Sequence, residues 1–407
     1  MDEASPAGAI QLRETARLLV REGRGILAAD ERTATLAKRF DAVGVPSTPE
    51  TQHAYREMLF GADSIGESLS GVILFDETIH QSTASGAPFP EHLAAQAVLP
   101  GIKVDRGAQP LAGFPGETVT EGLDGLRQRL AEYRALGARF AKWRAVIAVD
   151  TELPTTACVL ANAHALARYA ALCQEAGLVP IVEPEVLMDG SHTLERCFAV
   201  TESMLRALFT SLVTQRVALE AMILKPNMVA PGKTCATQAT TATIAAATVA
   251  CLHHTVPAAV PGIAFLSGGQ RPIQATERLD AINRLGPHPW HITFSFARAL
   301  QEDALSTWRG QVSNVDAARQ VFLHRAICNA AASRGAYSSD LEAICAVANL
   351  SIADRWPSWL RLAPIESVRS NNFWTAQSKS APAYVAIHFA NSGSGDEPLC
   401  SSRPTSR

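Results

Sequence analysis

Eight short apolar segments recur along the chain, and stretches with helical periodicity separate them. The segments cover residues 25–30, 71–77, 101–105, 140–147, 179–185, 221–227, 263–269 and 291–296. The clearest helix is expected over 155–176, where apolar residues return every three or four positions between Pro154 and Gly177. Eight strand–helix units over about 270 residues are typical of a closed barrel.

We therefore predict an α/β fold, a (β/α)8 TIM barrel in a single domain. An open doubly wound sheet is the alternative, but no Gly-x-Gly-x-x-Gly motif follows the first segment. The barrel is expected over residues 1–342, and a divergent C-terminal tail over 343–407.

Composition excludes several classes of protein. With 47% hydrophobic and 18% charged residues, the chain cannot be disordered throughout. Its net charge of −3 argues against a nucleic-acid partner. No apolar run is long enough for a transmembrane helix, and no secretory signal is read at the start of the sequence. The eight cysteines form no Cys-x-x-Cys pair, so we expect free thiols and neither disulfides nor metal ligation. We expect a cytoplasmic protein with no membrane partner.

Polar residues gather in the carboxyl-terminal halves of the apolar segments. All strands of a barrel end at one rim, and active sites are built there. Lys142 and Arg144 are two residues apart, as are Glu183 and Glu185, so each pair lies on one face of its strand. If that face points inward, two cations and two carboxylates share one cavity. The full set at this rim is Asp30, Glu77, Lys103, Lys142, Arg144, Glu183, Glu185, Lys225, Ser267 and Arg298.

Lys225 is the candidate nucleophile. It lies in an apolar strand, and lysine is rarely buried without a partner or a task. A desolvated lysine close to a second cation, for which Lys142 is the candidate, holds its proton less tightly and can attack a ketone to form a Schiff base. The alternative is a lysine that extends to solvent from the end of its strand.

Two carboxylates are candidates for proton transfer. Glu183 can donate a proton to the hydroxyl that leaves as the imine forms, and Asp30 can accept a hydroxyl proton during retro-aldol cleavage. The alternatives are a structural ion pair of Glu183 with Lys142 or Arg144, and a helix N-cap at Asp30.

Two groups of residues indicate phosphate binding. Ser267, Gly268 and Gly269 allow backbone N–H groups to approach an anion, and Arg298 can add a bidentate contact. A second basic group, with Lys38, Arg39 and Lys103, suggests a substrate with two anionic ends.

No metal site is predicted. The close histidine pairs, His253 with His254 and His288 with His291, lack the neighbouring carboxylates and helical spacing of a zinc site, so we expect structural histidines.

The chain closely resembles class I fructose-1,6-bisphosphate aldolase from about residue 10 to 340. The motifs that carry the resemblance are Gly25-Ile-Leu-Ala-Ala-Asp-Glu31, Gly71-Val-Ile-Leu-Phe, Gly101-Ile-Lys-Val-Asp105, Lys142-Trp-Arg144, Ile181-Val-Glu-Pro-Glu185, Leu224-Lys-Pro-Asn-Met-Val229, Phe265-Leu-Ser-Gly-Gly-Gln270 and Arg298-Ala-Leu-Gln301. The resemblance implies a metal-independent barrel enzyme without a cofactor, commonly a homotetramer, that acts on fructose 1,6-bisphosphate in glycolysis and gluconeogenesis.

The resemblance also implies residue roles. Lys225 forms the Schiff base, Glu183 transfers protons beside Lys142 and Glu185, and Asp30 serves carbon–carbon cleavage. Phosphate binding falls to Ser267, Gly268 and Arg298 at one end, and to Lys38, Arg39 and Lys103 at the other, with Arg144 nearby.

The chain departs from the family pattern at three places. Arg32 stands where the family usually has Ser, and Ala297 stands where it has Gly before the phosphate-binding arginine. The family ends in a terminal tyrosine that helps proton exchange, whereas this chain ends in Arg407 and has Tyr384 well before its end.

Two other functions are alternatives. The first is another lysine aldolase, either transaldolase-like or specific for a monophosphate. The second is a phosphosugar-binding or cytoskeletal interaction protein without catalysis, with the tail as its partner surface.

Overall fold

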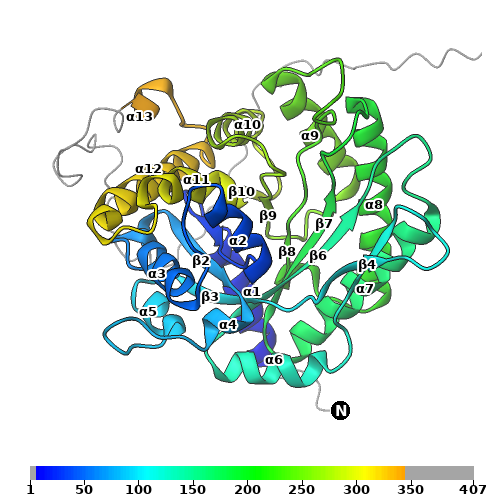
Figure 1. The fold of residues 1–407 in the computed structure, drawn as a ribbon. Coiled ribbons are helices and arrows are strands. Elements are labelled where there is room, and N and C mark those ends of the chain that lie inside the picture. The colour runs from blue at the N-terminus through cyan, green and yellow to red at the C-terminus, as the bar shows by residue number, and fades with distance from the viewer. Residues whose placement is uncertain (1–5, 344–407) are drawn as a thin grey trace, which may run out of the picture. The chain divides into compact units, whose positions relative to one another are not determined.

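The computed structural model describes residues 6–343, in which eight parallel strands close into a barrel surrounded by helices (Figure 1). The eight barrel strands are β1 (Gly25–Ala28), β2 (Leu69–Leu74), β3 (Leu99–Lys103), β6 (Phe140–Ile147), β7 (Val179–Val186), β8 (Ile223–Leu224), β9 (Gly262–Phe265) and β10 (His291–Phe296). Two further strands, β4 (Gly107–Pro110) and β5 (Thr118–Glu121), form a separate two-stranded sheet.

The α-helices follow the strands around the outside of the barrel. They are α1 (Pro6–Leu19), α2 (Thr33–Asp41), α3 (Pro49–Phe60), α4 (Asp76–Ile79), α5 (Phe89–Ala95), α6 (Leu126–Ala135), α7 (Thr156–Glu175), α8 (Leu194–Thr214), α9 (Thr241–Thr255), α10 (Pro272–Arg284), α11 (Arg298–Trp308), α12 (Val315–Ala332) and α13 (Ser339–Ala343). Short 3₁₀ turns lie at Ile65–Glu67, Leu219–Ala221 and Val312–Asn314.

The barrel strands pair in the order β1-β10-β9-β8-β7-β6-β3-β2, so each strand lies beside its neighbours in the chain. All eight predicted strand segments overlap these strands, and the predicted (β/α)8 fold is confirmed. The predicted helix over 155–176 is α7, and the Thr155 side chain caps it by accepting from the backbone N–H of Cys158.

One hairpin and one very short strand differ from the predicted pattern. β4 and β5 pair antiparallel between the third and fourth barrel strands, in a stretch without an apolar run. β8 has only two residues, and it is followed by Lys225 and by Pro226, which has no backbone N–H to donate.

Apolar residues close the amino-terminal end of the barrel. Leu12, Ala16 and Leu19 of α1 pack in one buried cluster with residues near the starts of the strands, including Phe140 and Val179. Because this end is filled with apolar side chains, the polar residues at the opposite strand ends are free to form a site.

Among the described residues, one helix, α8, is long and apolar enough to cross a membrane, judged by length and composition alone. Its buried residues include Met204 and Leu208, and the helix packs on α7, α9 and β7. Glu202 and Arg206 form an ion pair on its polar side. These contacts are those of an outer-layer barrel helix.

The predicted tail over 343–407 lies outside the described residues except for its first residue, so the division into a barrel and a tail stays a prediction. Tyr384 also lies outside them.

Close packing around Phe140 gives the first testable prediction. A Cβ added to Gly101 would lie 2.2 Å from the Phe140 ring, so Gly101→Ala forces the ring or the strand to move. We expect the free energy of unfolding to fall by about 1–3 kcal/mol, as for other overpacked cores. Thermal and urea unfolding measure the change.

The double variant Gly101→Ala/Phe140→Leu provides the control. The smaller side chain makes room for the added methyl, so the double variant should lose less stability than the two single variants lose together, by about 0.5–3 kcal/mol. Strictly additive effects would show that the ring does not obstruct the methyl.

Candidate active site

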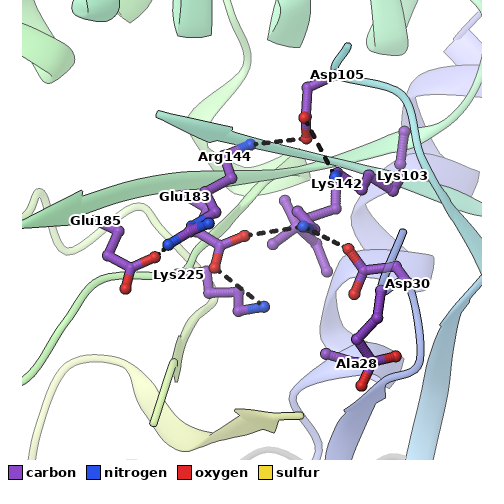
Figure 2. A network of polar contacts seen from close by, with 12 residues as sticks. Ala28, Asp30, Lys103, Asp105, Lys142, Arg144, Glu183, Glu185 and Lys225 are labelled. Carbon is purple, nitrogen blue, oxygen red and sulfur yellow. Dashed lines mark hydrogen bonds and ion pairs between the residues drawn. The ribbon is translucent and has the colours of Figure 1, made fainter. Parts of the chain in front are cut away.

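Strand register places the predicted polar residues on two successive levels of the barrel. Lys103 at the end of β3 is paired with Lys142 of β6, and Arg144 with Glu183 of β7. Leu224 of β8 is paired with Val182, so Lys225 follows its strand at the level of Glu183. The predicted convergence at the carboxyl-terminal rim is therefore seen in the structure (Figure 2).

A chain of alternating charges forms the centre of the site. Lys142 Nζ lies 2.6 Å from Asp30 Oδ2 and 3.3 Å from Glu183 Oε2. Lys225 Nζ lies 3.3 Å from the other oxygen of the same carboxylate, Glu183 Oε1. Figure 2 shows the four side chains pointing toward one another, Lys142 and Glu183 from within β6 and β7, and Asp30 and Lys225 from just after β1 and β8. Glu183 thus bridges the two lysines.

The environment of Lys225 favours its neutral amine. Its side chain is 3% exposed. Burial lowers the pKa of Lys225, the carboxylate of Glu183 opposes this, and the positive charge of Lys142 lowers it further, so the pKa ends below its ordinary value. The sequence-based expectation of a desolvated lysine beside a second cation agrees with this geometry, and a solvent-reaching lysine does not.

The other three residues of the alternating-charge network are held in their charged forms. Burial raises the pKa of Asp30, but the charges of Lys142, Lys225 and Lys103 outweigh it and leave this pKa well below its ordinary value. The pKa of Glu183 is also lowered, because Lys142 and Lys225 outweigh the effect of burial. Burial lowers the pKa of Lys142, but Asp30 and Glu183 raise it well above its usual range. Near neutral pH, Asp30 and Glu183 are therefore carboxylates, and Lys142 is an ammonium.

Two further pairs flank the central chain. Arg144 forms a close ion pair with Glu185. Lys103 lies 3.5 Å from Asp105, which also accepts from the backbone N–H of Arg144 at 3.3 Å. Asp105 was not among the site residues predicted from the sequence, although it follows Lys103 by two residues, the spacing that would place both on one face if the strand continued. Each of the four cations in this network thus has a carboxylate partner.

A second group forms around the loop after β9. Gly268 and Gly269 adopt φ values of +56° and +82°, in the left-handed region that glycine accepts without strain. A Cβ at Gly269 would lie 3.0 Å from both Arg298 Nη2 and Lys233 Nζ, so both cations lie against this loop. Ser267 is buried at its start. Lys233 was not predicted from the sequence, because a single lysine in a loop carries no pattern.

Lys38 and Arg39 have surroundings different from those of Lys103. Arg39 forms an ion pair with Glu31 and donates to Gln301 at 3.0 Å, while Lys38 is exposed on α2. Arg39 already has a carboxylate partner, which sequence spacing could not reveal. The structure records no contact that joins these two cations to Lys103 among the described residues, so their role in phosphate binding stays a prediction.

Asp30 does not cap a helix, because the residue at the N-cap of α2 is Arg32. Glu77, predicted at the rim, lies on α4 and is exposed.

The histidines considered for metal binding make structural contacts. His288 Nε2 lies 2.9 Å from the carbonyl of Ile282, and the His253 ring is 5.2 Å from that of Trp290.

One other group in the described part of the chain has the residue types of a metal site. His324, Cys328 and Glu342 bring their ligand atoms within 4.8 Å of one another. Glu342, however, accepts from both Arg325 and the Tyr337 hydroxyl, so its carboxylate is already engaged by a cation. The group belongs to α12 and α13, and the strand ends contribute nothing to it.

Comparisons with known proteins agree with this arrangement. The family model "Fructose-bisphosphate aldolase class-I" matches residues 11–355, which includes 343–355 of the segment expected to be divergent. A Xanthomonas axonopodis pv. citri protein named "Probable fructose-bisphosphate aldolase class 1" is 55% identical over 326 residues, covering 80% of this chain and 98% of its own length.

Proteins of other organisms give similar matches. Fructose-bisphosphate aldolase of Dictyostelium discoideum is 48% identical, covering 84% of this chain and 97% of its own length. A solved structure of fructose-bisphosphate aldolase from Plasmodium falciparum superposes with a TM-score of 0.81 at 47% identity, covering 82% of this chain and 97% of that one. The chain therefore belongs to the class-I fructose-bisphosphate aldolase family.

Proposed function

We propose that Lys225 forms the Schiff base through which this aldolase reversibly cleaves fructose 1,6-bisphosphate to dihydroxyacetone phosphate and glyceraldehyde 3-phosphate. The supporting observation is the contact of the Lys225 amine with Glu183 at 3.3 Å, in a buried site where the pKa of the amine is lowered. A nucleophilic amine and a proton-transfer group must lie this close to act on one carbon atom.

Formation of the imine requires Glu183. The Lys225 amine adds to the C2 carbonyl, and the resulting carbinolamine loses its hydroxyl as water. Glu183 first accepts a proton from the Lys225 ammonium, which leaves the neutral amine that attacks C2, and it then returns this proton to the hydroxyl that departs as water. Because Glu183 contacts both Lys225 and Lys142, the positive charge of Lys142 holds the carboxylate in place between these transfers.

Cleavage requires Asp30. Its carboxylate accepts the proton of the C4 hydroxyl, the C3–C4 bond breaks, and the electron pair moves into the iminium to give an enamine and glyceraldehyde 3-phosphate. Protonation of the enamine at C3, followed by hydrolysis of the imine, releases dihydroxyacetone phosphate. The lowered pKa of Asp30 keeps it unprotonated and ready to accept.

The two phosphates fall at opposite sides of Lys225. The 1-phosphate is one carbon from the C2 atom that the lysine attacks, so it must lie close to β8. The loop Ser267–Gly269 with Arg298 follows the two neighbouring strands β9 and β10. The 6-phosphate is four carbons from C2, and Lys103 on β3 is the charged group on the other side of β7 and β6.

We further propose, on the family resemblance, a cytoplasmic homotetramer that acts in glycolysis and gluconeogenesis without a metal. The expected mass in solution is about 174 kDa, four times the 43.4 kDa of one chain. Light scattering on the full chain tests this assembly.

Borohydride trapping tests the Schiff base. With dihydroxyacetone phosphate, reduction should convert the imine to a stable secondary amine on Lys225, found by mass spectrometry of the digested protein. Lys225→Arg keeps the positive charge but cannot form the adduct, so it should lose cleavage by a factor of 10⁴ or more, on the order of a full covalent pathway.

Two controls accompany this experiment. EDTA should leave cleavage unchanged, since the proposed steps use no metal. An adduct on another lysine, loss of activity with EDTA, or no cleavage by the native chain would each contradict the proposal. The last outcome would favour a sugar-phosphate-binding protein without catalysis.

The pH dependence of trapping tests the role of Lys142. Its positive charge lowers the pKa of Lys225 and pairs with Asp30 and Glu183. Lys142→Met removes that charge and leaves two carboxylates facing Lys225, and both changes raise the pKa of the amine. The rising limb of the trapping rate should therefore move to higher pH.

Lys142→Arg is the matched control, because it retains a positive charge at the same position. Its profile should remain closer to that of the native protein. A Lys142→Met profile at unchanged or lower pH would show that Lys142 does not set the pKa of Lys225. Thermal unfolding of both variants shows whether each is folded under the assay conditions.

A further inference from the structure

We propose that Arg32 binds the 6-phosphate beside Lys103 and sets a preference for fructose 1,6-bisphosphate over fructose 1-phosphate. This inference rests on the proposed function, because it takes Lys225 as the attachment point of the sugar. It concerns one side chain that differs from the family pattern, where serine is usual.

Arg32 lies between the catalytic end of β1 and the start of α2. It is two residues beyond Asp30, and it is the N-cap residue of α2, yet its side chain makes no capping hydrogen bond. The guanidinium instead lies over Gly107. A Cβ at Gly107 would be 2.3 Å from Arg32 Nη2 and 2.6 Å from Nη1, so the bare glycine leaves room for it. Gly107 opens β4, four residues after Lys103.

The charge of Arg32 acts on Lys103. Burial is the largest cause that lowers the pKa of Lys103, and the positive charges of Lys142 and Arg32 lower it further. Two cations that are close enough to influence each other in this way repel, and a dianion bound by both would relieve the repulsion. The geometry over Gly107 places Arg32 on the side of the site where the 6-phosphate is expected.

Arg32 differs from the four cations of the central network, for which no carboxylate partner is missing. Lys103, Lys142, Arg144 and Lys225 each contact a carboxylate. Within residues 6–343, no hydrogen bond or ion pair of the Arg32 side chain is recorded, and the group is half-buried. The four cations of the network are thus matched by four carboxylates, and Arg32 is an additional cation at this end without a carboxylate partner among the described residues.

A guanidinium suits the proposed ligand. It presents parallel N–H groups that match two phosphate oxygens, and such charge-assisted hydrogen bonds are about twice as strong as neutral ones. Fructose 1-phosphate has a neutral hydroxyl at C6 and cannot form this pair. Discrimination between two substrates depends on the difference in their interaction with one site, and Arg32 acts on only one of them.

The test is the ratio of kcat/KM for the 1,6-bisphosphate to kcat/KM for the 1-phosphate. In Arg32→Ser, the ratio should fall by about 10- to 100-fold, the loss expected for one charge-assisted contact. Most of the fall should come from a higher KM for the bisphosphate. Arg32→Lys keeps the charge without the paired N–H groups and should recover part of the ratio.

Arg271→Ser is the matched control. Arg271 is the N-cap residue of α10 and has nearly the same backbone angles, φ −63° and ψ 150°, against φ −63° and ψ 151° for Arg32. Any general effect of serine at such a position is therefore present in both variants. Because Arg271 follows the loop at the 1-phosphate end, which both substrates share, the ratio should change little.

Three outcomes overturn the inference. They are an unchanged ratio in Arg32→Ser, an equal loss with both substrates, and a ratio in Arg271→Ser that falls as far as in Arg32→Ser. Equal losses would mean that Arg32 only supports the local structure. Arg32→Gln, which keeps a long side chain without charge, should behave like Arg32→Ser and guards against a variant that fails to fold.

Trapping with dihydroxyacetone phosphate separates this inference from the proposed function. That compound has a carbonyl and one phosphate, which corresponds to the 1-phosphate, and it has no counterpart of the 6-phosphate. Arg32→Ser should therefore still form the borohydride adduct on Lys225. A native protein that forms no adduct contradicts the proposed function. A native protein that forms the adduct, together with an Arg32→Ser variant of unchanged ratio, contradicts only the role of Arg32.

Discussion

The bridge of Glu183 between Lys142 and Lys225 is the interaction on which the rest of the site depends. Burying four ionisable side chains costs several kcal/mol per ion unless each charge has a partner, and removing one partner of such a pair typically costs about 3–5 kcal/mol. Here Asp30, Lys142, Glu183 and Lys225 alternate in sign along one contiguous chain. The alternation makes the burial tolerable, and the burial in turn lowers the pKa of the nucleophile.

The barrel supplies the geometry that this alternation needs. Neighbouring parallel strands fix the relative height of their residues, so Arg144 is level with Glu183, and Lys103 with Lys142. The apolar cluster of α1 with Phe140 and Val179 fills the other end. Rigid strands with a packed end hold the charged side chains within hydrogen-bond reach, whereas loops would leave them free to move apart and take up water.

Sequence periodicity was sufficient to predict the strands and the central site, because both depend on local rules. Eight apolar runs give eight strands, and spacing of two places Lys142 with Arg144, and Glu183 with Glu185, on shared faces. The hairpin β4–β5 was missed because it has no apolar run, and Asp105 was missed because one carboxylate at a strand end is a weak signal. The phosphate-binding residues were less predictable, since their role depends on which cations are already paired with carboxylates.

Pairing with carboxylates explains why basic residues that were grouped from the sequence do not form one basic site. Arg39 was predicted to form one basic group with Lys38 and Lys103, but Glu31 takes up the charge of Arg39. Arg32 has no such partner, although it directly follows the same glutamate. An arginine contributes to anion binding only through charge that its own protein has not neutralised. For anion binding, the relevant quantity is therefore the excess of positive over negative charge around a cation. Only the three-dimensional arrangement of the side chains determines that excess.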